Sequence, residues 1–265
     1  MRNKKLWIVK AGSQMVIDGG PLLIRDWMQQ IKLLKTDYDI DVIWVTSGAI
    51  ATARRQSGID GKQSLAEKQA LSAMGQPLVH SLYHLGLEAL GLRTAQVLLT
   101  ADDLGNKKRR SSLVATLKTL LEWNVTPVLN ENDAVSTEEI QFGDNDRLSA
   151  LVAIAMKAER LVLLTDVDGL FDRDPKTATP GAPAQLIEAL TVVSAKTLRL
   201  AGRAGTTGVG KGGMLSKLLS AKAAHQYGID THLIRGDRAN ALVSITDPKR
   251  YGKSTGTHVS RKHRS

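Results

Sequence analysis

TPVLNENDAVSTEEIQFGDNDRLSALVAIAM (residues 126–156) joins an apolar run to an amphipathic helix through a segment crowded with carboxylate and carboxamide side chains. The apolar run, VTPVLN at 125–130, has the length and composition of a buried strand. The helix carries apolar side chains at i, i+3, i+4, i+7 and i+8, namely Leu148, Leu151, Val152, Ala155 and Met156. A strand that leads into a helix is the repeating unit of α/β folds, so this stretch indicates the fold class.

Short apolar runs alternate with longer amphipathic ones along the rest of the chain. The expected strands cover 6–11, 41–47, 93–100, 125–130, 160–166 and 230–235, and the expected helices lie near 20–35, 63–90, 111–123, 145–158 and 213–227. Strands separated by helices favour a parallel sheet that helices cover on both faces. Within the turn-rich segment 167–190, the Asp168-Gly169 pair predicts a hairpin.

The composition is that of an ordinary globular protein: of 265 residues, 42% are hydrophobic and 23% are charged. This length suits one large domain or two small ones, and no linker marks a boundary. The chain has no cysteine, which excludes disulfides and thiolate-bound metals and agrees with a reducing, cytoplasmic location. No apolar run approaches the ~18 residues of a membrane span, and the N-terminal apolar run is too short for a signal sequence.

The net charge of +10 allows two interpretations. Basic clusters at 107–110, 249–250 and 261–264 could bind nucleic acid. They could equally be solvated charges that attract an anionic small-molecule substrate. Aromatic residues make up only 4% of the chain and do not alternate with the basic ones, as they would in a base-stacking surface. The second interpretation is favoured, and a non-catalytic nucleic-acid-binding protein is the alternative from a different class.

Polar residues follow four of the expected strands, at the positions where an open α/β sheet binds its ligands. These strand ends carry KAGS at 10–13, TSGA at 46–49, NEND at 130–133 and TD at 165–166. Residues of these types commonly bind phosphate and carboxylate groups. Lys10 could stabilise a transferring phosphoryl group, although an isolated lysine at a strand end often extends into solvent instead.

A pocket for a free amino acid needs an acceptor for the ammonium group and donors for the α-carboxylate. Asp133 could supply the acceptor and the turn at Ser47 the donors. The alternatives are an Asp that shapes its own turn and a Ser that caps the next helix. The helix near 145 needs one cap, yet Asp144, Asn145 and Asp146 are all available. We therefore expect at least one of these three to face a ligand.

The segment AGTTGVGKGGMLSKL at 204–218 contains two incomplete nucleotide-binding patterns. Gly212 stands where a P-loop has Ser or Thr, and no apolar strand precedes this pattern or the dinucleotide pattern, so both folds are rejected. Backbone N–H groups at the start of the following helix would favour phosphate, with Lys211 and Lys217 on either side. The alternative is a flexible surface loop. The apolar side of this helix would consist of Met214, Leu215, Leu218 and Leu219.

The stretches VKAGS, VTSGAI, NENDAV, FGDNDRLSA, LLTDVDGLFDRDP and GVGKGGMLSKL occur in this order and resemble the amino acid kinase family. NENDAV followed by FGDNDRLSA is typical of its glutamate 5-kinase branch. The branches that act on acetylglutamate, aspartate, carbamate or uridylate share only the lysine and glycine pattern. The resemblance implies a three-layer α/β/α sandwich with a largely parallel central sheet. It further implies one kinase domain over 1–258 and a basic tail at 259–265.

The resemblance also implies a reaction: ATP with Mg²⁺ phosphorylates the γ-carboxylate of L-glutamate to L-glutamyl 5-phosphate, the first step of proline biosynthesis. Lys10 and Lys217 would stabilise the transferring phosphoryl group, and Asp146 would orient them. Glutamate would be held by Ser47, Asp133 and Asn145. ATP would contact Lys10, Thr165, Asp166, Lys211, Gly212, Gly213, Met214, Leu215, Ser216 and Lys217. No metal site made of protein ligands is expected, and no general base is needed because the attacking carboxylate is ionised at neutral pH.

Some features depart from the family pattern or leave alternatives open. Gln14 replaces a small hydroxyl residue, Lys211 replaces a small residue before GGM, and the C-terminal PUA domain of many bacterial members is not expected here.

Acetylglutamate is the main alternative substrate, and its blocked amine would leave Asp133 without a role. The resemblance suggests a homodimer or homotetramer, proline inhibition through a loop near 134–143, and coupling to glutamate-5-semialdehyde dehydrogenase. Neither nucleic acid nor membrane is an expected partner.

Overall fold

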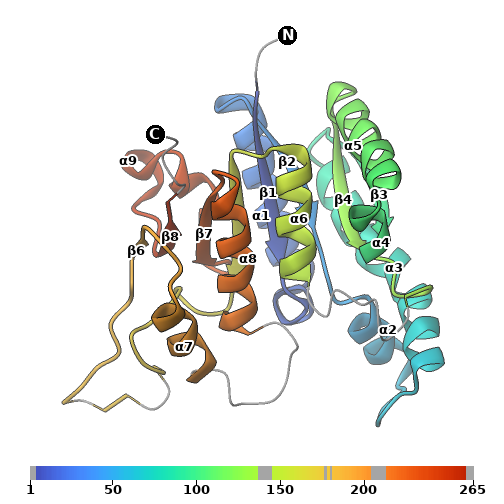
Figure 1. The fold of residues 1–265 in the computed structure, drawn as a ribbon. Helices are drawn as coiled ribbons and strands as arrows, with labels where there is room; N and C mark the ends of the chain where they lie inside the picture. Colours follow the sequence, from blue (N-terminus) through green and yellow to red (C-terminus); the bar gives the residue numbers. More distant parts are fainter. Residues whose placement is uncertain (1–3, 137–144, 176–177, 180, 204–212, 261–265) are drawn as a thin grey trace.

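The computed structural model describes residues 4–136, 145–175, 178–179, 181–203 and 213–260. Within these residues the strands are β1 Lys5–Ala11, β2 Ile40–Val45, β3 Arg93–Leu99, β4 Val125–Glu131, β5 Arg160–Thr165, β6 Ala189–Leu190, β7 Asp230–Arg235 and β8 Gly256–Val259. They form one sheet with the order β3-β4-β2-β1-β5-β7-β8-β6 (Figure 1). The strands from β3 to β7 in this order are parallel, β8 is antiparallel to β7, and β6 is parallel to β8.

Helices cover both faces of this sheet (Figure 1). One apolar layer joins the sheet to α1 and α3 around Trp7 and Trp44, and the other joins it to α5, α6 and α8 around Ile8 and Leu163. The predicted largely parallel sheet and the implied three-layer α/β/α sandwich are therefore confirmed. The described helices are α1 Ser13–Asp37, α2 Ala49–Ser57, α3 Leu65–Glu88, α4 Ala101–Gly105, α5 Lys107–Glu122, α6 Asn145–Met156, α7 Ala195–Arg203, α8 Met214–Gln226, α9 Pro248–Tyr251 and the 3₁₀ helix η1 Val243–Ile245.

The burial of the central strands explains why their sequences read as continuous apolar runs. Every residue of β2 and β4 is buried, and so are the last five residues of β1 and of β5. Strands with both faces covered lose the alternation of apolar and polar side chains that a half-exposed strand shows. The edge strand β3 has exposed positions and contains Arg93 and Gln96. None of the described helices is both long enough and apolar enough to span a bilayer.

Three aromatic side chains fix α1 and α3 to the sheet. Trp44 of β2 lies between Trp27 of α1 and Tyr83 of α3, with ring centroids 5.3 and 5.7 Å apart. All three side chains are fully buried, and Trp27 Nε1 donates a hydrogen bond of 2.8 Å to the Gly236 carbonyl oxygen. Large buried aromatic groups contribute much of the packing energy of a core. These contacts hold two helices in fixed positions relative to β2.

A second contact fixes α3 against α2. A Cβ atom at Gly75 would lie 1.9 Å from the carbonyl oxygen of Ala49, the first residue of α2. The two backbones therefore meet without a side chain between them. A capping box between Ser64 and Glu67 defines the start of α3. The middle of α3 is thus held directly beside the turn that follows β2.

The structure contains elements that the sequence patterns did not predict. The helix expected near 20–35 begins earlier, at Ser13, and is kinked at Gly20, where φ is +56° and Pro21 follows. The patterns missed α2, α4, α7, α9, β6 and β8, which are short or mostly polar. Their short apolar runs carry too little periodicity for detection.

The predicted hairpin turn at Asp168-Gly169 is wrong. The antiparallel bridge in this region pairs Phe171 with Leu186, while Asp168 and Gly169 lie in bends. Gly169 has φ of +130°, and a Cβ there would lie 2.7 Å from Thr257 Oγ1 of β8. Close approach of β8, rather than a two-residue turn, explains this glycine.

We predict that Gly75→Ala lowers the free energy of unfolding by about 3 kcal/mol, because the new methyl group overlaps the Ala49 carbonyl and forces the two backbones apart. Gly86→Ala in the same helix is the control. There a Cβ would meet the flexible Met28 side chain at 3.1 Å, and alanine favours the helix by up to about 1 kcal/mol. Urea unfolding of both variants is the measurement, and equal stabilities would contradict the close contact.

Candidate active site

The predicted site residues that the structure describes lie along one edge of the sheet, where the carboxyl ends of the parallel strands meet. Across this edge the strands follow the order β4, β2, β1, β5 and β7. Lys10 is in the central strand β1, between the polar residues after β2 and β4 on one side and those after β5 on the other. The strand order therefore places Lys10 between two groups of candidate ligand-binding residues.

Lys10, Asp146 and Lys217 form a buried ion cluster. Lys10 Nζ lies 2.5 Å from Asp146 Oδ1, and Lys217 Nζ lies 3.0 Å from Asp146 Oδ2. Asp146 is in the first turn of α6 and Lys217 in the first turn of α8. The exposed fractions are 2% for Lys10, 0% for Asp146 and 6% for Lys217. One carboxylate thus holds two ammonium groups that come from different elements.

This cluster brings two ammonium groups together where water has little access. Burial strengthens the attraction between these ammonium groups and an anion. The helices α1 and α8 begin after Gly12 and Gly213, and neither residue supplies a side-chain cap for the first N–H groups. A Cβ at Gly12 would lie 3.8 Å from Lys10 Nζ. Free helix N–H groups beside lysines suit a phosphate group.

A network of amide hydrogen bonds lies on the β2 and β4 side of the cluster. Asn145 Nδ2 donates to the Thr46 carbonyl oxygen at 2.6 Å, to Asn130 Oδ1 at 2.7 Å and to Ser47 Oγ at 3.3 Å. Ser47 Oγ donates to the Ala11 carbonyl oxygen at 3.2 Å. All of these side chains are at least 90% buried. The first residue of α6 thus joins the ends of β2 and β4, as the predicted grouping of Ser47 with Asn145 requires.

The same network extends onto α3 and reaches Asp133. Gln76 accepts from Asn130 Nδ2 at 2.9 Å through Oε1, and its Nε2 donates to the Glu131 carbonyl oxygen at 2.9 Å and to Ser72 Oγ at 3.4 Å. Ser72 Oγ donates to Asp133 Oδ2 at 3.4 Å. Gln76 and Ser72 were not among the predicted site residues. A usable signal was the spacing of polar residues at 69, 72 and 76, which places them on one helix face.

Tyr83 supports the turn that contains Ser47. Thr46 Oγ1 donates a hydrogen bond of 2.9 Å to Tyr83 OH. Burial raises the pKa of Tyr83 to about 12, so the phenol is neutral at physiological pH. This contact couples the aromatic packing of α3 to the residue directly before Ser47.

The nucleotide side of the predicted site is described in part. Thr165 is buried, Asp166 is exposed, and Thr165 Oγ1 donates to Asp166 Oδ1 at 3.2 Å. At the neighbouring end of β7, Arg235 forms an ion pair with Asp237 at 2.6 Å, and this contact lowers the pKa of Asp237. Both strand ends lie at the same edge of the sheet as Lys10.

The remaining predicted ATP contacts surround the start of α8. Gly213 and Leu215 are exposed, Met214 and Ser216 are partly buried, and Lys217 is buried. Leu218 is buried as expected, but Leu215 and Leu219 are 40% and 49% exposed, so the apolar side of α8 is narrower than predicted. Lys211, Gly212 and Asp144 lie outside the described residues, as does most of the loop expected near 134–143.

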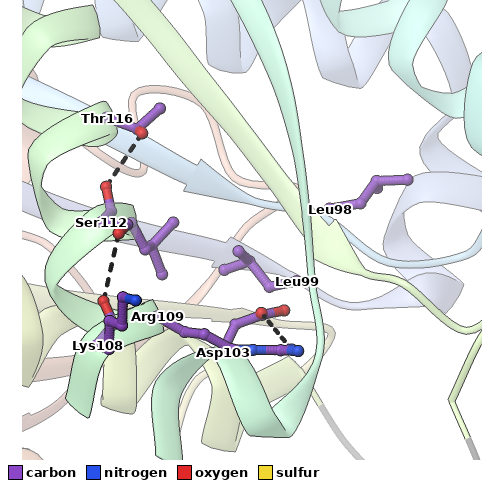
Figure 2. Close-up of a pocket in the computed structure, with 8 residues that line it drawn as sticks. Leu98, Leu99, Asp103, Lys108, Arg109, Ser112 and Thr116 are labelled. Atoms are coloured by element: carbon purple, nitrogen blue, oxygen red, sulfur yellow. Dashed lines mark hydrogen bonds and ion pairs between the residues drawn. The ribbon is translucent and has the colours of Figure 1, made fainter. Parts of the chain in front are cut away.

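A separate cavity of about 510 Å³ lies between β3 and α5. Figure 2 shows Asp103 beside Arg109, and Ser112 and Thr116 on the face of α5 that borders the cavity. This cavity lies beside the edge strand β3 and includes none of the predicted site residues. Its lining consists of Leu98, Leu99, Asp103, Lys108, Arg109, Ser112, Leu113 and Thr116.

Comparison with known proteins agrees with this geometry. The model of the amino acid kinase family matches residues 5–235. The chain belongs to the amino acid kinase family. The match contains all three residues of the ion cluster and the whole amide network.

Similar members of the amino acid kinase family are named glutamate 5-kinase. The protein from Geobacter metallireducens is 47% identical over 196 residues, covering 74% of this chain and 52% of its own. The protein from Alcanivorax borkumensis is 37% identical over 262 residues, covering 97% of this chain and 67% of its own. The protein from Thermus thermophilus is 38% identical over 266 residues, covering 98% of this chain and 69% of its own. The chain thus spans about half to two thirds of the length of these curated relatives.

Two solved structures share the fold of this amino acid kinase family member. N-acetylglutamate synthase from Neisseria gonorrhoeae, complexed with coenzyme A and N-acetyl-glutamate, matches with a TM-score of 0.68 at 16% identity, over 98% of this chain and 60% of its own. UMP kinase from Ureaplasma parvum matches with a TM-score of 0.61 at 17% identity, over 98% of this chain and 100% of its own. At these identities the likeness concerns the fold alone.

We predict that Asp146→Ala lowers the free energy of unfolding by about 3–5 kcal/mol, because two buried ammonium groups lose the carboxylate they share. The control is Asp102→Ala, which removes an exposed ion pair with Arg109 and should cost less than about 1 kcal/mol. Urea unfolding at low salt measures both changes. Similar small losses would show that the cluster contributes no more than a surface ion pair.

Proposed function

We propose that this chain transfers the terminal phosphoryl group of ATP to the γ-carboxylate of L-glutamate and releases L-glutamyl 5-phosphate and ADP. The observation that carries the proposal is the Lys10–Asp146–Lys217 cluster, because it lies between the amide network and the strand ends after β5 and β7. The names of the similar proteins support glutamate as the acceptor.

The proposed transfer needs positioning and charge stabilisation more than acid–base chemistry. A γ-carboxylate oxygen forms a bond to the terminal phosphorus, and the bond from this phosphorus to the bridging oxygen of ADP breaks. No proton has to move, because the carboxylate is ionised at neutral pH. The ammonium groups of Lys10 and Lys217 would face the charge on the transferring group, and Asp146 holds both in place.

The amide network supports specific roles for individual atoms in the recognition of glutamate. Asn145 uses its amide hydrogens to hold Thr46 and Asn130, so Oδ1 is the atom that it would present to an ammonium group. The Asp133 carboxylate would contact the same ammonium group. The α-carboxylate would accept from backbone N–H groups of the turn at Ser47 and of the first turn of α2, because the Ser47 hydroxyl donates to the Ala11 carbonyl oxygen and Gly48 supplies no side-chain cap.

Mg²⁺ would enter as part of the ATP complex. Among the described residues, no group of three His, Cys, Asp or Glu side chains could hold a metal ion, and both Asp146 oxygens contact lysines. Mg²⁺ is commonly held through substrate phosphates and water with few protein carboxylates. The residues present fit a metal that the nucleotide carries.

The expected homo-oligomer, proline inhibition and coupling to glutamate-5-semialdehyde dehydrogenase stay predictions.

A hydroxylamine trap tests the proposed reaction. Purified protein receives Mg·ATP, hydroxylamine and either L-glutamate, N-acetylglutamate or aspartate. We expect hydroxamate with L-glutamate only. In Lys217→Ala, kcat should fall by about 10²–10³-fold, because a charge-stabilising group is lost. Lys222→Ala, an exposed lysine of the same helix, should keep the parent rate. Hydroxamate with N-acetylglutamate instead would overturn the substrate, and none with any acceptor would overturn the reaction.

Replacement of Asp133 tests the ammonium contact. We predict that Asp133→Ala raises the KM for glutamate at least about tenfold, because a charge-assisted hydrogen bond contributes roughly 1.5–3 kcal/mol. The KM for ATP should change less than about twofold and is the internal control. Initial rates at varied glutamate and ATP provide both constants. An unchanged KM for glutamate would remove Asp133 from the pocket.

A further inference from the structure

Two buried polar side chains of α3 have no part in the proposed phosphoryl transfer. Gln76 is 5% exposed and Ser72 is 0% exposed. They lie one helical turn apart on the same face of the helix. Buried polar groups in a helix cost stability unless they are paired, so their presence calls for a physical reason.

Gln76 holds the last two residues of β4 with both ends of its amide. Its Oε1 accepts from Asn130 Nδ2, and its Nε2 donates to the carbonyl oxygen of Glu131, each at 2.9 Å. The two contacts determine the orientation of the Gln76 amide, because a carbonyl oxygen can only accept. The hydrogen bond from Asn130 Nδ2 to Gln76 also orients the Asn130 amide, so that Asn130 Oδ1 accepts from Asn145 Nδ2 at 2.7 Å. In this way α3 determines the orientation of the Asn145 amide indirectly.

Ser72 links Gln76 to Asp133, which lies on the other side of the proposed glutamate pocket. Its hydroxyl lies 3.4 Å from Gln76 Nε2 and 3.4 Å from Asp133 Oδ2. One face of α3 therefore contacts both Asp133 and the asparagine that holds Asn145. These two contacts set the separation between the two groups that would bind the substrate ammonium.

The position of α3 itself is fixed by contacts outside this network. Gly75, next to Gln76, packs directly on the Ala49 backbone, and Tyr83 packs on Trp44 with a centroid distance of 5.7 Å. A helix held in this way can act as a rigid support for the side chains that line a site.

We propose that Gln76, assisted by Ser72, is a positioning residue that sets the spacing of Asp133 and Asn145 and so determines the affinity for glutamate. This inference rests on the proposed function. A residue that only filled the core would affect stability without affecting one substrate more than the other. The side-chain hydrogen bonds of Gln76 join it to β4 and to Ser72 rather than to the ion cluster, so its loss should weaken glutamate binding selectively.

The test compares Gln76→Met with Gln30→Met. Gln30 of α1 is also buried, at 2% exposure, and its amide also uses both ends, accepting from the Leu242 N–H at 2.7 Å and donating to Asp26 at 2.7 Å. We expect Gln76→Met to raise the KM for glutamate about tenfold, with the KM for ATP and kcat within about twofold of the parent. Gln30→Met should lower the melting temperature and leave the KM for glutamate unchanged.

A second pair of variants keeps the test decisive if Gln76→Met does not fold. Ser72→Ala removes a single hydroxyl and should raise the KM for glutamate about threefold. In an Asp133→Ala background the same change should have no further effect, because Ser72 would act through Asp133. Equal KM values in the parent and Ser72→Ala, or equal shifts in Gln76→Met and Gln30→Met, would overturn the inference. A parent enzyme that forms no glutamyl hydroxamate would instead show that the proposed function itself is wrong.

Discussion

The buried carboxylate of Asp146 is the interaction on which the arrangement of the site depends. It contacts Lys10 from the central strand and Lys217 from α8, while Asp146 itself lies in the first turn of the neighbouring helix α6. Three elements from distant parts of the chain must therefore pack correctly before the charges can pair. An unpaired charge in this environment would be costly, so the ion cluster and the packing of α6 and α8 on the sheet require each other.

The strand order gives this cluster two different surroundings. The ends of β2 and β4 supply neutral amides and hydroxyls that are already linked to one another, whereas the ends of β5 and β7 supply Thr165, Asp166 and the Arg235–Asp237 pair. A parallel sheet gathers these groups at one edge while β1 keeps them apart. This separation suits a reaction in which two anionic substrates approach a shared pair of cations from opposite sides.

Sequence patterns predicted the central strands because burial on both faces leaves continuous apolar runs such as LWIVKA at 6–11. They also made Lys10 and Ser47 candidate site residues, because ligands bind at strand ends in this fold class. The kink at Gly20 has a local signal in Pro21, which follows it. The role of Gly169 was not predictable, since it depends on contact with the distant strand β8. Gln76 was missed for the same reason: its partner Asn130 is 54 positions away, and a glutamine in a helix carries no local signal for such a pairing.

The shared carboxylate of the ion cluster shows that this site is not arranged for folding stability alone. Buried ion pairs rarely contribute more to folding than well-packed apolar groups of similar size. Here Lys10 and Lys217 contact the same carboxylate, which is 0% exposed. A ligand that binds only the folded chain raises its stability, so an anion bound beside these two lysines would make the protein harder to unfold.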